Sequence, residues 1–442
     1  MIFRWLLPLG GLIGVGLLLL LAFGTAALPW IMPQEDLAGR RLAAIGIFVA
    51  SYLALAIGKV PGLSIDRAGV ALVGACLMVA SGAISLDDAW RAVDPGTITL
   101  LLGMMIIVAN LRISGFFALV TSWVARRIHG PVLLLGAIIV VSGVFSAFLV
   151  NDAICLVMAP LVLDLTLSLR RNPVPYLLAV AMASNVGSAA TITGNPQNMM
   201  IGSFSAIPYQ EFTAALAPVA VLGLLLTFAL LAVVHRKNLR ADTYRTRVPR
   251  LRIHRVLVLR SICAAALTVA LFFAGQPPAK VAIVVGALLL LTRRIKSTRV
   301  YTEIDWSLLL MFTGLFIIVA GAQQQLLTPQ TIQSVGALHL QSAPVLSLVT
   351  AILSNLVSNV PAVLVLKPFV TALPAPERAW LVVAMASTLA GNLTVLGSIA
   401  NLIVVEKAAR RGVMIGFWDY FRIGAPLTVL TLIVGTLWLM LR

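Results

Sequence analysis

Charged residues are scarce in this sequence, at 11% of 442 residues, and acidic residues are the scarcest, with 15 against 32 lysines and arginines. A soluble protein of this length needs a far more polar surface, so the composition excludes that class and predicts an integral membrane protein. The apolar runs are continuous over about 18 to 20 residues instead of alternating, which excludes β-barrel strands. We therefore predict an all-α polytopic membrane protein with about 11 transmembrane helices.

Cysteine and histidine are also scarce. The three cysteines, Cys76, Cys155 and Cys263, lie in separate apolar segments without the spacing of metal ligands, so we predict neither a disulfide nor a metal site. The four histidines form no HExxH motif, and the sequence has no P-loop and no nucleophile triad. We therefore predict that the protein is not an enzyme, with no catalytic residues and no cofactor.

The net charge of +17 lies in short basic clusters between apolar runs, such as Arg170 and Arg171. That placement follows the positive-inside rule and argues against a nucleic-acid partner. We expect the basic stretch 236–255 in the cytoplasm and the acidic stretch 87–94 outside. The apolar run 5–28 is expected to remain as a first helix, with a signal peptide as the alternative. The N-terminus is then cytoplasmic and the C-terminus external, in a bacterial inner membrane.

Three apolar runs are longer than one membrane crossing: 131–169, 176–207 and 343–373. Arginines flank 131–169 on both sides, so both of its ends are expected in the cytoplasm. This pattern predicts a hairpin that turns near Asn151 and Asp152, although two full spans would satisfy the same charges. Both ends of 343–373 are poor in basic residues, which predicts a second hairpin of opposite orientation.

The two hairpins belong to an internal repeat. Without gaps, 144–160 aligns with 352–368 at an offset of 208. At an offset of 203, VAMASNVGSAATITGNPQN aligns with VAMASTLAGNLTVLGSIAN, and eight of the nineteen positions are identical. Repeated elements of opposite orientation are typical of inverted-repeat transporters. The predicted domains are an N-terminal extra helix with its outer loop (1–40), a first inverted repeat (41–235), a basic cytoplasmic linker (236–255) and a second inverted repeat (256–442).

The stretch ASNVGSAATITGNPQN, residues 183–198, is rich in turn-forming and amide residues although it lies inside an apolar run. One interpretation is an exposed loop. We favour a broken transmembrane helix, because non-helical backbone at membrane depth is tolerated where it lines a cavity. Such a break exposes N–H groups that attract anions and C=O groups that coordinate cations, and short hydroxyls and amides add uncharged ligands. The candidate ligands in the two halves are Thr191, Thr193, Gly194, Asn195, Asn198, Thr394, Gly397, Ser398 and Asn401.

The three long runs contain three ionisable residues: Asp152, Asp164 and Lys367. A buried charge in lipid costs about 3 kcal/mol, so each is a candidate functional group. Asp152, at the hairpin turn, is the strongest candidate, with helix capping as its alternative role. We expect Asp164 to be structural, near the interface, and Lys367 either to snorkel outward or to neutralise an acid.

Several further motifs carry a family resemblance, namely SGFF, FLVNDA, SNLVSNVPAVLV, GNLTVLGSIANL and FWDYFRIGAP. They resemble the Ion Transporter superfamily, specifically the arsenite permease and sodium/proton antiporter group (ArsB/NhaD), and more distantly the divalent anion/sodium symporters. The resemblance implies two re-entrant hairpins whose tips meet the loops of two broken helices. The tip residues would be Asn151 and Asp152 in the first hairpin, and Ser358 and Asn359 in the second. It also implies a homodimer whose transport domains move against a fixed scaffold, an elevator-type mechanism.

We therefore expect a secondary active transporter of a small inorganic oxyanion or its neutral acid, of the arsenite or antimonite type, with Asp152 carrying a coupling proton. The alternatives are a sodium/proton antiporter, a sodium-coupled di- or tricarboxylate transporter of the citrate kind, and a channel. Neither tip has the Ser-Asn-Thr triplet of the dicarboxylate branch. The expected partners are the small anion or acid, H+ or Na+ as coupling ion, membrane lipid, a second copy of the chain and, for an arsenite-type function, a soluble ATPase subunit.

Overall fold

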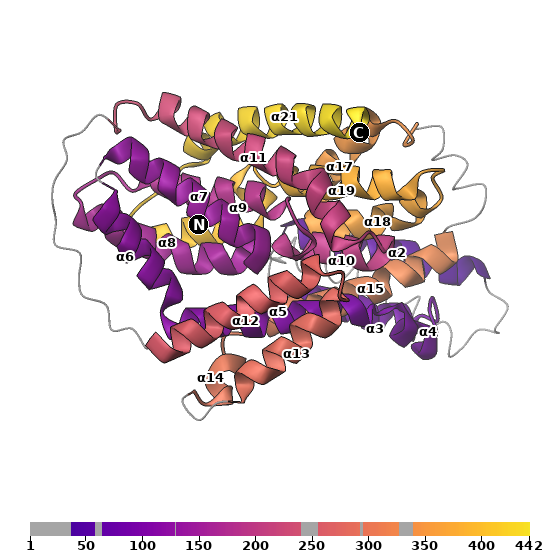
Figure 1. The fold of residues 1–442 in the computed structure, drawn as a ribbon. Coiled ribbons are helices and arrows are strands. Elements are labelled where there is room, and N and C mark those ends of the chain that lie inside the picture. Colours follow the sequence, from indigo (N-terminus) through magenta and orange to yellow (C-terminus); the bar gives the residue numbers. More distant parts are fainter. Residues whose placement is uncertain (1–36, 58–63, 129, 240–254, 292–294, 327–338) are drawn as a thin grey trace, which may run out of the picture. The chain divides into compact units, whose positions relative to one another are not determined.

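The computed structural model describes residues 37–57, 64–128, 130–239, 255–291, 295–326 and 339–442 (Figure 1). Every regular element in these ranges is a helix, which confirms the predicted all-α class. The expected first helix at 5–28 and most of the basic linker lie outside the described residues.

Eight helices among the described residues are long and apolar enough to cross a membrane, which needs about 20 residues. Three of the five shorter apolar helices in the described ranges, Val174–Ser188, Ala343–Val357 and Asn359–Thr371, form parts of the hairpins and of the broken helices described below. The eight candidate spans are Gly39–Ile57, Pro95–Ser114, Pro131–Leu149, Asn151–Ser168, Tyr209–Val234, Arg255–Phe273, Trp306–Leu326 and Phe417–Leu441.

Both predicted hairpins are present. The first consists of α7 (Pro131–Leu149) and α8 (Asn151–Ser168), and the second of α17 (Ala343–Val357) and α18 (Asn359–Thr371). A single residue with positive φ joins the helices in each case, Val150 (φ 64°) and its repeat equivalent Ser358 (φ 78°). Non-glycine residues rarely adopt this conformation, so the equivalence of the two turns is specific. The repeat alignment thus located both turns to within one residue.

Both predicted helix breaks are present as well. The first helix is interrupted as α9 (Val174–Ser188), the short 3-10 turn η2 (Ile192–Gly194) and α10 (Pro196–Ser205). The second follows the same order as α19 (Pro376–Ala390), η3 (Val395–Gly397) and α20 (Ile399–Ala409). The residue before each 3-10 turn has nearly the same backbone conformation, with φ and ψ of −138° and 164° at Thr191 and of −136° and 165° at Thr394. The repeat therefore extends to the backbone of the loops.

The described residues form two compact units, and each unit draws on both predicted repeats. The described residues of the first unit are 37–57, 64–98, 305–326, 339–342 and Leu356–Pro374. Within it the Tyr52 hydroxyl donates to the Pro361 carbonyl at 3.3 Å and so joins α2 to α18. The helices that lie in this unit are α2 (Leu37–Ile57), α3 (Arg67–Ala80), α4 (Leu86–Ala92), α15 (Trp306–Leu326) and α18.

The described residues of the second unit are 99–128, 130–239, 255–291, 295–304, Ala343–Asn355 and Ala375–Arg442. It contains the first hairpin, both broken helices and most of α17. A Cβ on Gly187 of α9 would lie 2.2 Å from the Gly143 carbonyl oxygen of α7, so glycine permits the close crossing of these two helices. Its other helices are most of α5 (Pro95–Ser114), α6 (Phe116–Arg127), α11 (Tyr209–Val234), α12 (Arg255–Phe273), α13 (Pro278–Leu290), α14 (Ser297–Tyr301) and α21 (Phe417–Leu441).

Candidate functional site

The two helix breaks meet inside the second unit in a buried cluster of polar side chains, which we call the amide network. Each of its members is at most 5% exposed, and all of them are uncharged amides or hydroxyls. Since buried polar groups need partners, the hydrogen bonds of the network define what the site can do. The network consists of Asn151, Asn185, Ser188, Asn195, Gln197, Asn198, Thr388, Asn392, Ser398 and Asn401.

In the first break, two asparagines satisfy backbone groups that the interruption leaves open. Asn195 is the N-cap of α10, and its side-chain oxygen accepts from the Asn198 N–H at 2.8 Å. Asn198 Nδ2 donates to the carbonyls of Ser188 and Thr191 at 3.2 and 3.0 Å. The last carbonyl of α9 and the carbonyl that precedes the 3-10 turn therefore already accept hydrogen bonds from the chain itself.

The second break repeats this arrangement. Asn401, the repeat equivalent of Asn198, donates through Nδ2 to the carbonyls of Gly391 and Thr394 at 2.8 and 3.1 Å. Glycine is required at the turn of the first break, because a Cβ on Gly194 would lie 2.0 Å from the Ser188 carbonyl oxygen. The predicted ligands Asn198 and Asn401 thus hold the two breaks in shape.

Thr388, on α19, connects the second broken helix to the first break. Its hydroxyl accepts from Asn195 Nδ2 at 3.0 Å and from Gln197 Nε2 at 3.3 Å, and it lies 3.4 Å from Asn198 Oδ1. The equivalent position in the first repeat is Asn185, on α9, which faces the second break. Asn185 and Thr388 are equivalent in the repeat, and each forms hydrogen bonds from its own broken helix to the break of the other one.

Asn185 bonds through its side chain to four other residues of the network. Its Nδ2 donates to Asn392 Oδ1 and Asn401 Oδ1, both at 2.9 Å. Its Oδ1 accepts from Asn151 Nδ2 and from the Ser398 hydroxyl, both at 3.1 Å. These four bonds use the full hydrogen-bonding capacity of a primary amide.

Asn185, Thr388 and Asn392 were not among the residues that the sequence predicted for the site. For Asn185 and Thr388, the available signal was an amide or a hydroxyl directly after the repeated VAMAS, within otherwise apolar helix. Their partners lie up to 216 positions away in the chain, so the alignment of the repeats could not reveal them.

Two predicted residues of the first loop bind neighbouring helices. The Thr191 hydroxyl donates to the Ala147 carbonyl of α7. The Thr193 hydroxyl pairs with the Tyr209 hydroxyl at the start of α11, at 2.9 Å. In the second loop, Thr394 is half-buried and supplies its carbonyl to Asn401, whereas Gly397 is buried. The loops are therefore fixed to the helices around them.

The tip of the first hairpin reaches the network through Asn151, which is 4% exposed. While Asn151 Nδ2 donates to Asn185, its Oδ1 is buried and has no hydrogen-bond donor among the described residues. Asp152 is half-buried in the first turn of α8, where the helix dipole stabilises a carboxylate. Asp164 is 54% exposed and lies 3.2 Å from Arg411 as a surface ion pair.

The second hairpin contributes the end of α17 to this unit. The Ser354 hydroxyl donates to the Ser387 carbonyl at 3.0 Å, and Asn355 Nδ2 donates to the Ala390 carbonyl at 3.1 Å. Asn355 Oδ1, like Asn151 Oδ1, is buried without a donor among the described residues. Ser358 and Asn359 belong to the first unit, so their contact with the loops stays a prediction.

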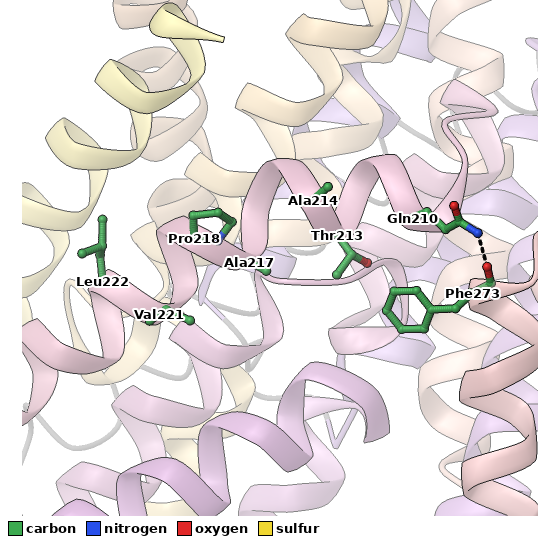
Figure 2. Close-up of a pocket in the computed structure, with 8 residues that line it drawn as sticks. All are labelled: Gln210, Thr213, Ala214, Ala217, Pro218, Val221, Leu222 and Phe273. Carbon is green, nitrogen blue, oxygen red and sulfur yellow. Dashed lines mark hydrogen bonds between the residues drawn. The ribbon is translucent and has the colours of Figure 1, made fainter.

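A separate groove of about 680 Å³ runs along α11 (Figure 2). Its walls are mostly apolar, and Gln210 donates to the Phe273 carbonyl at one end. No residue of the amide network lines this groove. Nor do the described residues include a group of three His, Cys, Asp or Glu side chains that could hold a metal ion. The lining residues are Gln210, Thr213, Ala214, Ala217, Pro218, Val221, Leu222 and Phe273.

Known proteins resemble the chain over nearly its whole length. An uncharacterized transporter of Mycobacterium tuberculosis is 31% identical, over 91% of this chain and 98% of its own. A silicon efflux transporter of Oryza sativa subsp. japonica is 29% identical, over 89% of this chain and 95% of its own. The YdaH transporter of Alcanivorax borkumensis, at 15% identity, shares the fold with a TM-score of 0.61 over 91% of this chain and 97% of that one.

These relatives are named as transporters. A family model also matches the chain, over residues that lie in both predicted repeats. Residues 52–390, which include the first hairpin, the first break and the second hairpin, match the citrate transporter family model. This places the chain in the expected superfamily of ion transporters rather than among enzymes. The chain belongs to the citrate transporter family, CitMHS.

Proposed function

We propose that the protein is a proton-coupled secondary transporter of a small inorganic oxyacid of the arsenite or antimonite type, and that it recognises this acid in its neutral form. The observation that carries the proposal is Asn151 Oδ1, a buried acceptor at the hairpin tip without a donor among the described residues. A buried polar atom without a partner costs about 1 to 3 kcal/mol. A substrate hydroxyl that donates to this oxygen would recover that cost.

The uncharged character of the amide network supports a neutral substrate. An oxyanion has fewer O–H donors than its neutral acid, and its charge needs cationic or N–H donors to offset the cost of desolvation. The network contains no lysine or arginine, and its amide donors already have partners. A neutral acid such as As(OH)3 carries several O–H donors. Dissolved silicon, the element for which the rice relative is named, is likewise an uncharged hydroxylated acid at neutral pH.

The carbonyl oxygens of the two breaks distinguish between a proton and a sodium ion as the coupling ion. Sodium coupling would use the carbonyl oxygens that a broken helix exposes. The carbonyls of Thr191 and Thr394 already accept from Asn198 and Asn401. A sodium ion would have to compete with these amides, which supports a proton as the coupling ion. The family description keeps citrate transport as a second candidate function.

Asp152 is the proposed carrier of the coupling proton. It lies beside Asn151, so its protonation state acts directly on the tip that would hold the substrate. A carboxylate at membrane depth is a functional group by default. Asp152 is half-buried at the hairpin tip, whereas Asp164 is 54% exposed at the surface, and this difference favours Asp152 for the role.

The proposal also covers how the protein moves, its oligomeric state, its membrane and its partner. The division into two compact units supports an elevator-type movement, in which one unit moves and the other is the scaffold. We further propose a homodimer in a bacterial inner membrane, with the N-terminus cytoplasmic and the C-terminus external. An arsenite-type function adds a soluble ATPase subunit as a partner.

A substrate panel in proteoliposomes tests the proposed function. We expect saturable uptake of arsenite and silicic acid at neutral pH and little uptake of sulfate, arsenate or citrate. Arsenite uptake should fall as the pH rises above the pKa of the acid, because the ionised form loses an O–H donor and gains a charge. Protein-free liposomes at each pH are the control. Uptake of citrate or sulfate without uptake of either neutral acid would contradict the proposal.

A further inference from the structure

We infer that Asn185 is a positioning residue that orients the amide of Asn151 and thereby makes the site select substrates that donate hydrogen bonds. This inference rests on the proposed function, because it assumes that Asn151 Oδ1 meets the substrate. Asn185 itself is 2% exposed and saturated with partners, so it acts through Asn151 and not by contact with the substrate.

The orientation begins at backbone carbonyls, which can only accept hydrogen bonds. Asn401 Nδ2 faces the carbonyls of Gly391 and Thr394, at 2.8 and 3.1 Å, so the Asn401 group that faces Asn185 must be the oxygen. Asn392 Nδ2 faces the Met182 carbonyl at 3.4 Å, which orients Asn392 in the same way. The carbonyl contacts of Asn401 and of Asn392 therefore leave the Oδ1 atoms of both residues facing Asn185 as acceptors.

Asn185 must meet these two acceptors with its NH2 group. Its oxygen then faces Asn151 and Ser398. Asn151 in turn must present its own NH2 group to that oxygen, which leaves Asn151 Oδ1 as the atom without a donor. Turning any one of these amides around would bring two acceptors or two donors together at about 3 Å. The free atom at the hairpin tip is therefore an acceptor because of Asn185.

The other half of the repeat lacks this constraint. Thr388 occupies the position equivalent to Asn185, and a hydroxyl can rotate to donate or accept. It bonds with Asn195 and Gln197 as acceptor, and its remaining hydrogen lies toward Asn198 Oδ1. The fold thus tolerates threonine at this position of the repeat, which supplies a conservative substitution for the test.

The test compares the selectivity of Asn185→Thr with that of the wild type. The threonine hydroxyl can donate to Asn151 as well as accept from it, so the Asn151 amide is no longer held with its oxygen outward. We expect the ratio of arsenite uptake to arsenate uptake in proteoliposomes to fall about tenfold or more, with transport retained. A residue that only supported the fold would change the overall rate and the melting temperature but not this ratio.

Two further variants keep the result decisive if Asn185→Thr folds poorly. Asn185→Asp, neutral at this buried position, retains the acceptor toward Asn151 and one O–H donor toward Asn392 and Asn401, so its arsenite to arsenate ratio should stay at the wild-type value even if it melts earlier. Thr302→Ser, at an exposed position outside the amide network, keeps the hydroxyl that donates to the Arg299 carbonyl at 2.9 Å and should leave both the ratio and the melting temperature unchanged.

The outcomes separate this inference from the proposed function. A wild-type protein that transports neither arsenite nor silicic acid overturns the proposed function. A wild-type preference for neutral acids that Asn185→Thr retains overturns the inference about Asn185 alone. An Asn185→Asp protein that transports but has lost the preference also overturns it, because that variant keeps the acceptor that orients Asn151.

Discussion

Asp152→Asn is expected to abolish uptake driven by a pH gradient and reduce it to the level of protein-free liposomes. Asparagine keeps the size of the side chain at the hairpin tip but cannot bind and release a proton. Exchange of labelled for unlabelled arsenite at equal pH on both sides should persist, since it needs the binding site and the movement but no net proton transfer. Both rates can be measured on the same proteoliposomes.

Asp164→Asn is the matched control for this prediction. It makes the same chemical change on the same helix, but its carboxylate is 54% exposed and faces Arg411. Loss of a surface ion pair costs about 0 to 1 kcal/mol, so uptake should remain near the wild-type rate. Equal loss in both variants, or gradient-driven uptake retained by Asp152→Asn, would show that Asp152 does not carry the coupling proton.

Gly194→Ala is expected to have the largest effect on stability. The added Cβ would lie 2.0 Å from the Ser188 carbonyl oxygen, which is a backbone atom held by Asn198 and Asn195. Overpacking of this kind costs about 1 to 3 kcal/mol or more, and the strain falls on the break itself. We expect a lower melting temperature and loss of transport, measured by thermal unfolding in detergent and by uptake.

The control for the glycine is Gly46→Ala, on α2. A Cβ there would meet no atom within 4 Å, and alanine is a better helix former than glycine. Its melting temperature should equal or exceed that of the wild type. If Gly194→Ala melts at the wild-type temperature and transports normally, the close approach of the loop to α9 is not needed for the site.

The hairpins and helix breaks could be predicted because their signals are local or repeated. Arginines flank the first hairpin on both sides, and the sequence match at an offset of 208 pairs its turn with that of the second. The repeated VAMAS marks the half-helix that precedes each break. These patterns depend on composition and spacing, which do not require knowledge of how distant segments pack.

The partners within the site could not be predicted in the same way. Asn198 and Asn401 look like ligands in the sequence because amides in an apolar run are rare. In the structure their Nδ2 groups satisfy the carbonyls that the breaks leave open. Whether an amide serves a ligand or the backbone depends on distances of a few tenths of an ångström, which a residue pattern does not contain.

The sequence by itself determined the all-helical membrane class, the repeat, the two hairpins and the two breaks, since hydropathy, flanking charge and self-similarity are properties of the linear chain. Only the tertiary structure decided that Asn185 joins both breaks to the hairpin tip, through partners that lie 34 to 216 positions away. The tertiary structure also decided whether the oxygen or the NH2 group of each amide faces a given neighbour. That orientation follows from fixed carbonyls in three dimensions, and it leaves the Asn151 Oδ1 acceptor buried without a donor among the described residues.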